Sequence, residues 1–186
     1  IGNRQSQPIG GFFISLHERN TRRIMNEKRR LLGMTLDELK GVAFEAGLPG
    51  YAAKQMADWL YKKKVTSIAA MTNIASAKRA LLEKNFEVGA VPPSDLMKSV
   101  DGTIKYLYPA GPGNFVESVY IPTEDRATLC VSSQVGCKMN CLFCMTGKQG
   151  FTKNLSANEI LNQIQSLPET EELTNIVFMG MGEPLD

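Results

Sequence analysis

Residues 136–144 read GCKMNCLFC, which places Cys137, Cys141 and Cys144 in a C-x3-C-x2-C pattern. Three thiols this close in sequence can point from one loop at a single metal centre. Thiolates favour iron-sulfur clusters, zinc or copper(I), and a structural zinc normally takes four protein ligands. A four-iron cluster held by three cysteines keeps one iron free to bind a small molecule. The spacing therefore favours a 4Fe-4S cluster with an open coordination position.

A zinc site is the alternative, because Cys130 lies shortly before this loop and completes a set of four cysteines. Zinc sites usually draw their ligands from two separated C-x2-C pairs, which this sequence lacks. A disulfide framework is disfavoured, since four cysteines are few for 186 residues and no signal peptide precedes them. No apolar run approaches the length of a membrane span. We therefore expect reduced thiols in a soluble, cytoplasmic protein without membrane contact.

A second segment, TNIVFMGMGEP at residues 174–184, reads as a buried parallel strand that runs into a glycine turn. Glycines in such a turn would let a ligand approach the backbone closely, and ligands bind at the carboxyl ends of parallel strands. Glu183 could accept hydrogen bonds from an ammonium group. Alone, the turn is more often a tight loop than a cofactor site. Its place about forty residues after a three-cysteine loop makes the cofactor interpretation stronger.

A predicted helix connects the two segments. Ser156 and Glu159 form a capping-box pattern, and apolar residues at 160, 161, 164 and 167 recur at helical spacing before Pro168. Together with strands at 126–131 and 175–179, this helix predicts a β-α-β unit whose crossover begins with the cysteine loop. Both loops would then lie at the same end of adjacent parallel strands.

Four motifs occur in one order along the chain: ESVYIP at 117–122, CVSSQVGC at 130–137, FCMTG at 143–147 and GMGEPL at 180–185. In this they resemble the bacterial dual-specificity adenine-C2 methyltransferases. Those are radical S-adenosylmethionine (SAM) enzymes that methylate an adenosine in 23S rRNA and one in certain tRNAs. The resemblance implies an α/β fold: the first part of a partial (β/α)6 TIM-like barrel, preceded by a small helical domain and a β-hairpin.

The resemblance also implies roles for single residues. The three loop cysteines match the ligands of the 4Fe-4S cluster, and Phe143 matches an aromatic residue beside the cluster and SAM. Gly182 and Glu183 match the turn that holds the methionyl end of SAM. Glu117 matches a proton acceptor, and Cys130 matches a thiol that helps to release the methylated base. By pattern alone, Glu117 is an outward polar residue of a strand and Cys130 a small buried hydrophobe.

Radical chemistry is needed in this family because C2 of adenine carries an inert hydrogen. One SAM methylates a cysteine near the carboxyl terminus, and an electron from the cluster splits a second SAM. The resulting radical takes hydrogen from the S-methyl group, the methylene radical adds to C2, and a disulfide frees the product. None of the four cysteines here matches the methyl-carrying one, so we expect an amino-terminal half that cannot methylate RNA alone.

The rest of the sequence predicts two further domains before the barrel. Residues 1–33 form a basic leader with net charge +5, which we expect to be poorly ordered. Residues 34–91 form a helical accessory domain, with helices at 35–46, 52–63 and 75–85, which we assign to RNA binding through basic residues at 62–64, 78, 79 and 84. Residues 92–186 hold a hairpin that turns at Asp101-Gly102 and then the first βα units of the barrel, truncated at the carboxyl end.

The predicted function is thus a radical SAM methyltransferase acting on C2 of adenosine, with SAM and a 4Fe-4S cluster as cofactors. Its partners would be 23S rRNA, tRNA and an electron donor such as flavodoxin or ferredoxin, and we expect a monomer. Two alternatives stay open. One is the C8-methylating, antibiotic-resistance relative, which shares nearly all these motifs. The other is a zinc-stabilised RNA-binding module without catalysis.

Overall fold

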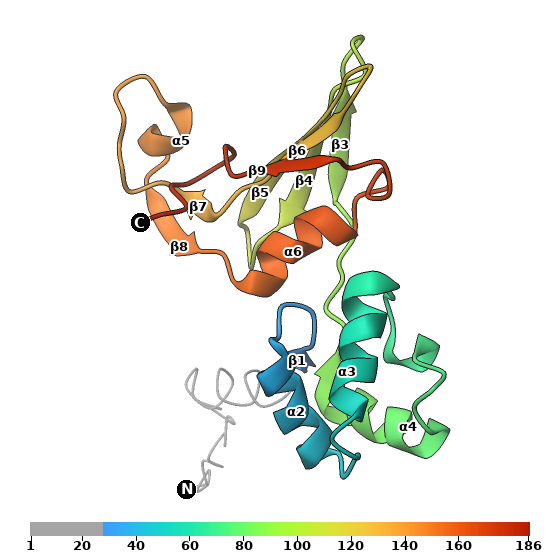
Figure 1. Cartoon of the computed structure of the whole chain (residues 1–186). Coiled ribbons are helices and arrows are strands. Elements are labelled where there is room, and N and C mark those ends of the chain that lie inside the picture. Colours follow the sequence, from blue (N-terminus) through green and yellow to red (C-terminus); the bar gives the residue numbers. More distant parts are fainter. Residues whose placement is uncertain (1–27) are drawn as a thin grey trace, which may run out of the picture.

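The computed structural model describes residues 28–186, which form a helical unit and a sheet unit joined near residue 90 (Figure 1). We predicted a poorly ordered basic leader over residues 1–33. Residues 1–27 of this leader lie outside the described part of the chain. From Arg29 onward the chain is part of the helical unit, so the expected boundary at residue 34 falls inside that unit.

The helical unit is a small bundle closed by a two-stranded parallel sheet. Thr35 begins the first helix as predicted: its hydroxyl accepts a hydrogen bond from the Glu38 amide, and the Glu38 carboxylate accepts one from the Thr35 amide. The elements in chain order are β1 (Arg29–Arg30), α2 (Leu36–Glu45), α3 (Ala52–Ala57), the π-helix η1 (Asp58–Lys62), the 3-10 helix η2 (Ile68–Ala70), α4 (Ser76–Asn85) and β2 (Phe86–Glu87).

The core of this unit collects the inward faces of all these elements. Leu31 and Leu32 are buried because β1 pairs with β2 and carries the chain under the helices. Leu82 of α4 is also fully buried. In the same helix, Ala77 and Leu81 are exposed. Only one narrow side of α4 packs on the bundle.

The sheet unit contains five strands in the order β3-β4-β5-β6-β9. The first four pair antiparallel, and β6 pairs with β9 in parallel, which confirms the predicted β-α-β unit. The hairpin turns at Asp101-Gly102 as predicted, with Gly102 at a positive φ of 87°. The strands are β3 (Asp95–Lys98), β4 (Ile104–Pro109), β5 (Phe115–Pro122), β6 (Ala127–Cys130) and β9 (Asn175–Val177).

Helix α6 (Ala157–Gln165) covers one face of this sheet (Figure 1). Val116, Ser118 and Tyr120 alternate along β5 and are buried on the face that packs against α6. The residues between them lie on the other face, which carries no helix among residues 28–186. The sheet therefore has one covered face and one open face.

A short hairpin, β7 (Gln134–Gly136) and β8 (Phe151–Asn154), follows β6 and was not predicted. The cysteine loop and the one-turn helix α5 (Met145–Lys148) connect its strands. Close backbone contact explains why residue 136 is a glycine. A Cβ on Gly136 would lie 1.7 Å from the carbonyl oxygen of Gly150. Such a contact between distant residues leaves no local sequence signal.

Strand β9 is shorter and more exposed than predicted. The expected strand at 175–179 ends at Val177, and Ile176 is 45% exposed rather than buried. The reason is its position at the edge of the sheet, where no described strand pairs with its outer side.

Among residues 28–186, no helix is both long and apolar enough to cross a membrane.

Candidate functional site

The cysteine loop leaves the sheet directly after β7. Cys137 follows Gly136 and is buried, Cys141 is exposed, and Cys144 is the residue from which α5 begins. Leu142 and Phe143 between them are 91% and 90% exposed. Phe143, predicted to lie beside a cluster and SAM, therefore points away from the described protein surface.

The thiol of Cys144 lies in an environment that favours its ionised form. Backbone amides of Gly147 and Thr146, in the turn that begins α5, lower the pKa of Cys144 below its ordinary value. Iron and zinc bind the thiolate rather than the thiol. The chemistry of this donor set thus fits a soft metal or an iron-sulfur cluster.

The geometry of the loop does not assemble such a site. Within residues 28–186, no three His, Cys, Asp or Glu side chains lie close enough together to hold a metal ion. The three cysteines share one loop, but their sulfur atoms do not converge on one point. Ligation by these three residues stays a prediction, and it requires the loop to change conformation.

The glycine turn lies against the strand that leads into this loop. The carbonyl of Met181 accepts hydrogen bonds from the amides of Ser133 and Gln134, at 2.9 and 3.1 Å. Next to it, the ion pair of Lys138 and Asp186 spans 3.0 Å. The two predicted site segments, about forty residues apart in sequence, are therefore brought together at the carboxyl ends of β6 and β9.

The glycines of this turn allow close packing against the segment that leads into the cysteine loop, and binding of SAM by the turn stays a prediction. A Cβ on Gly182 would lie 2.5 Å from the Cβ of Gln134, and one on Gly180 would lie 2.7 Å from the Val131 carbonyl. Gly182 also has a φ of 101°, which favours glycine.

Two polar residues that sequence reasoning did not single out hold this turn. The hydroxyl of Ser132, a fully buried residue, accepts from the Met181 amide at 2.8 Å and donates to the Glu117 carbonyl at 2.6 Å. The side-chain oxygen of Gln134 accepts from the Glu183 amide at 3.0 Å. Both belong to the CVSSQVGC motif, where polar residues interrupt an apolar strand.

Glu117 and Cys130 lie on the open face of the sheet. Val119 is the register partner of Cys130, and Glu117 precedes Val119 by two residues on β5. Residues two apart in a strand share a face, and register partners do as well. The carboxylate of Glu117 pairs with Lys105 on β4 at 3.0 Å, and partial burial raises the pKa of the Cys130 thiol.

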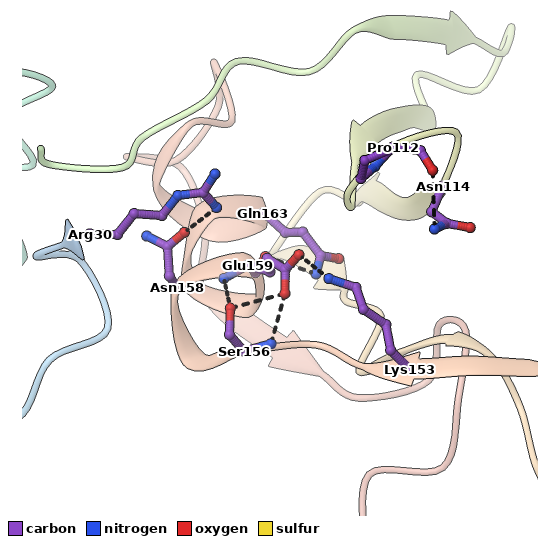
Figure 2. Close-up of polar contacts among 8 residues, drawn as sticks. All are labelled: Arg30, Pro112, Asn114, Lys153, Ser156, Asn158, Glu159 and Gln163. Carbon is purple, nitrogen blue, oxygen red and sulfur yellow. Dashed lines mark hydrogen bonds and ion pairs between the residues drawn. The ribbon is translucent and has the colours of Figure 1, made fainter. Parts of the chain in front are cut away.

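A cleft of about 830 Å³ lies elsewhere, between the helical unit and the sheet unit. Four basic residues line it, Lys28, Arg29, Arg30 and Lys153, and the last three are paired with Glu45, Glu87 and Glu159. Figure 2 shows Lys153 reaching the carboxylate of Glu159, which also closes the predicted capping box with Ser156. Because three of these four cations are paired and the cysteines line another surface, we do not place the site in this cleft.

Much of the predicted RNA-binding patch has internal partners. Lys64 binds Thr170 and Glu171, Lys78 donates to the carbonyl of Ala46, and Arg79 donates to the carbonyl of Ala69. Lys62, Lys63 and Lys84 are exposed on the helical unit, where Lys62 pairs with Asp58 at 2.7 Å and the Lys63 ammonium lies over the Trp59 ring.

Two family models match the chain. Residues 29–88 match the ribosomal RNA large subunit methyltransferase N-terminal domain, and residues 131–186 match the radical SAM superfamily. The first match covers the helical unit, and the second contains the cysteine loop and the glycine turn.

Curated relatives match over most of the chain. A protein of Parabacteroides distasonis named "Probable dual-specificity RNA methyltransferase RlmN" is 82% identical over 162 residues, which are 87% of this chain and 47% of the relative. The dual-specificity RNA methyltransferase RlmN of Geotalea uraniireducens is 46% identical over 159 residues, 86% of this chain and 46% of the relative. The chain thus spans about half the length of the curated relatives it matches.

A solved structure shows the same fold. The crystal structure of a radical SAM methyltransferase from Sphaerobacter thermophilus superposes with a TM-score of 0.76 at 37% identity, covering 84% of this chain and 48% of that one. This confirms the predicted fold class, a partial radical SAM barrel with a helical unit before it. With two family models, close curated relatives and this fold in agreement, the chain is a relative of the RlmN-type radical SAM RNA methyltransferases and spans about half their length.

Proposed function

We propose that this chain is part of a radical SAM methyltransferase that methylates C2 of adenosine in 23S rRNA and in tRNA through a methyl-cysteine intermediate. The support for RNA as substrate comes from the names of the curated relatives, which include dual-specificity RNA methyltransferases. The support for the chemistry comes from the arrangement of two loops and one sheet face in this chain.

One observation carries the proposal: the cysteine loop and the glycine turn lie at the end of the sheet whose open face bears Glu117 and Cys130. A base entering over that face would meet a carboxylate and a thiol on neighbouring strands. It would also lie next to the carboxyl ends of β6 and β9, where parallel sheets bind their ligands. No described helix blocks this approach.

Cys137, Cys141 and Cys144 would hold the 4Fe-4S cluster, with Phe143 beside it. Gly182 and Glu183 would hold the methionyl end of SAM. When bound, the cluster would supply one electron to SAM, which makes reaction at an inert C–H carbon possible. Gln134 orients the backbone of Glu183 through its 3.0 Å hydrogen bond and so sets where that carboxylate can reach.

Glu117 would accept the C2 proton. Its ion pair with Lys105 holds the carboxylate at the sheet surface, where 43% of the Glu117 side chain is still exposed. Cys130, on the neighbouring strand β6, would attack the sulfur that links enzyme and product. A disulfide would form as the bond from that sulfur to the product's carbon breaks, and the electron pair left on that carbon would take up a proton to give the methyl group. The thiol of Cys130 must lose its proton for this attack, and its raised pKa makes a nearby base useful.

The helical unit would bind RNA through its exposed lysines. The whole protein would act in the cytoplasm as a monomer, supplied with electrons by a flavodoxin or a ferredoxin. The methyl-carrying cysteine would lie outside this chain, because its four cysteines are matched to other roles.

The test uses the full-length protein that contains this chain, reconstituted anaerobically with iron and sulfide. We expect the EPR spectrum of the reduced cluster to shift when SAM is added, and mass spectrometry of digested RNA to find 2-methyladenosine. A zinc-bound, colourless protein would contradict the proposal, and 8-methyladenosine would replace C2 by C8 as the target.

Two variants test the residue roles. Glu117→Gln and Cys130→Ser should each lower product formation at least a hundredfold, while the SAM-dependent EPR shift is retained. Glu124→Gln, which removes an exposed carboxylate from the turn after β5, and Thr128→Ala, on the same strand as Cys130, are the matched controls. Product formation in the Cys130→Ser protein at the rate of Thr128→Ala would contradict the assigned thiol.

A further inference from the structure

Helix α6 buries two asparagines that its amphipathic pattern does not require. Asn158 and Asn162 are 8% and 7% exposed, although asparagine is a poor helix former whose amide needs partners when buried. Their spacing of four residues places them one above the other on one side of the helix. That side faces the helical unit, whereas Ile160 and Ile164 pack against the core of the sheet.

The amide of Asn158 binds three groups of the helical unit. Its nitrogen donates to the carbonyls of Leu32 at 3.0 Å and Gly89 at 3.2 Å. Its oxygen accepts from Arg30 at 3.2 Å, the bond that Figure 2 shows. Leu32 lies just after β1 and Gly89 just after β2. One side chain of the crossover helix therefore binds the segments that follow both strands of the small parallel sheet.

Asn162 forms a two-way bond with a single residue. Its oxygen accepts from the Val91 amide at 2.7 Å, and its nitrogen donates to the Val91 carbonyl at 2.8 Å. Val91 belongs to the segment that joins the two units. The segment that joins the two units is thus held to α6 by two hydrogen bonds, because the Asn162 side chain pairs with both the backbone donor and the backbone acceptor of Val91.

Two glycines make this close approach possible. A Cβ on Gly33 would lie 2.6 Å from the Asn158 amide nitrogen, and one on Gly89 would lie 2.9 Å from the Asn158 side-chain nitrogen. Both glycines have positive φ, 98° and 82°. The only other polar tie between the units recorded among residues 28–186 joins Lys64 to Thr170 and Glu171, and Glu171 is 82% exposed, so water and salt weaken it.

We propose that Asn158 and Asn162 are positioning residues that lock the helical unit onto the crossover helix of the sheet unit. The part of this inference that concerns RNA rests on the proposed function. An RNA bound by the helical unit is then presented to the open face of the sheet at a fixed distance. Two surfaces held in a fixed arrangement act on one ligand with a higher effective concentration than two surfaces joined flexibly.

The lock is tested first without RNA, by hydrogen exchange of the Val91 amide and by small-angle X-ray scattering of this chain. Asn162→Leu, alone and together with Asn158→Leu, should speed exchange at Val91 at least tenfold, and the double variant should increase the radius of gyration. Gln165→Leu is the matched control, because it removes an α6 amide that has no hydrogen bond to any described residue. Exchange at Val91 and scattering equal to those of Gln165→Leu would overturn the proposal.

The second measurement follows methyl transfer to RNA by the full-length protein. The double variant should raise KM for RNA about tenfold, keep kcat within twofold and leave SAM binding unchanged. Simple destabilisation would instead lower the active fraction and therefore the apparent kcat. A lowered kcat with unchanged KM overturns the positioning role. Absence of methyl transfer by the unmodified protein would overturn the proposed function, and the exchange experiment would still decide the lock.

Discussion

Glu117 on β5 and Cys130 on β6 lie on the same, open face of the sheet, because Val119 is both two residues after Glu117 and the register partner of Cys130. The carboxylate and the thiol are therefore held by the sheet itself and not by a loop. A shift of the β5–β6 register by one residue would turn one of them into the core under α6. The two side chains keep their relative positions as long as β5 and β6 stay paired.

The first prediction concerns the reactivity of Cys130. Burial raises its pKa, so less thiolate is present near neutral pH than in the unfolded chain. We expect iodoacetamide labelling of Cys130 to follow a pH profile with its midpoint above that of the same residue in urea. Mass spectrometry of the labelled peptides measures both profiles. A native midpoint at or below the denatured one would contradict the burial of this thiol.

The second prediction compares two glycines of the β7–β8 hairpin. Gly136 and Gly150 both have positive φ, at 74° and 75°, but a Cβ on Gly136 would meet the Gly150 carbonyl at 1.7 Å and one on Gly150 would meet nothing within 4 Å. Gly150→Ala should therefore cost only the strain of a left-handed residue, about 1–2 kcal/mol. Gly136→Ala should cost clearly more, because the hairpin must open.

Urea unfolding of the two variants measures this difference in the free energy of unfolding. Equal losses for both would mean that the hairpin does not hold Gly136 against Gly150. The comparison is sharp because both substitutions add the same methyl group at nearly the same φ.

The sequence predicted those elements whose signals are local. Both capping boxes, the Asp101-Gly102 hairpin and the parallel pairing of β6 with β9 depend on short motifs or on the handedness of β-α-β units. The β7–β8 hairpin and the β1–β2 pair could not be predicted, because each is two to four residues long and depends on distant partners.

The candidate site likewise contains features that the sequence reveals and features that only the fold reveals. The cysteine spacing and the glycine turn are visible in the sequence, whereas Ser132 and Gln134 gain their roles only when the turn folds back on them. The exposure of Ile176 had no signal at all, since an apolar run does not reveal whether its strand lies at an edge. Asn158 and Asn162 looked like polar positions of an amphipathic helix.

The third prediction concerns Ser132. Ser132→Ala would leave the partly buried amide of Met181 without its acceptor, which costs about 1–3 kcal/mol. We expect a loss of that size in urea unfolding and faster hydrogen exchange at Met181. Ser133→Ala is the control, since the Ser133 side chain has no hydrogen bond to a described residue and only its backbone holds the turn. Equal exchange at Met181 in the two variants would contradict the role of the Ser132 hydroxyl.

The fourth prediction is a pH dependence at the start of α6. Burial acts to raise the pKa of Glu159, but hydrogen bonds from Lys153 and Ser156 outweigh it, so the folded pKa lies below the ordinary value of 4.5. A lowered pKa means that the carboxylate stabilises the fold fully above about pH 4.5, and that this contribution is lost as the pH falls through the folded pKa.

Glu159→Gln keeps an acceptor for the capping box but loses the ion pair with Lys153. The difference in the free energy of unfolding between the original chain and this variant should be largest near pH 7 and shrink below pH 4.5. Urea titrations from pH 3 to pH 7 measure it. A gap that stays constant over this range would contradict an ionised Glu159 as the source of the stabilisation.

The fifth prediction is that loading an iron-sulfur cluster rearranges the cysteine loop. No three candidate ligands converge within residues 28–186, and Leu142 and Phe143 are almost fully exposed, so we expect the loop to change conformation when three sulfurs bind one cluster. Lys138, whose side chain is 46% exposed, lies between two of the cysteines. Trypsin should cleave after it at least tenfold more slowly once iron and sulfide are incorporated anaerobically. Cleavage after Lys98, exposed on the distant β3, should not change.

Cys141→Ser should abolish the protection at Lys138, because it removes the most exposed of the three predicted ligands. Equal protection in this variant would show that Cys141 does not bind the cluster.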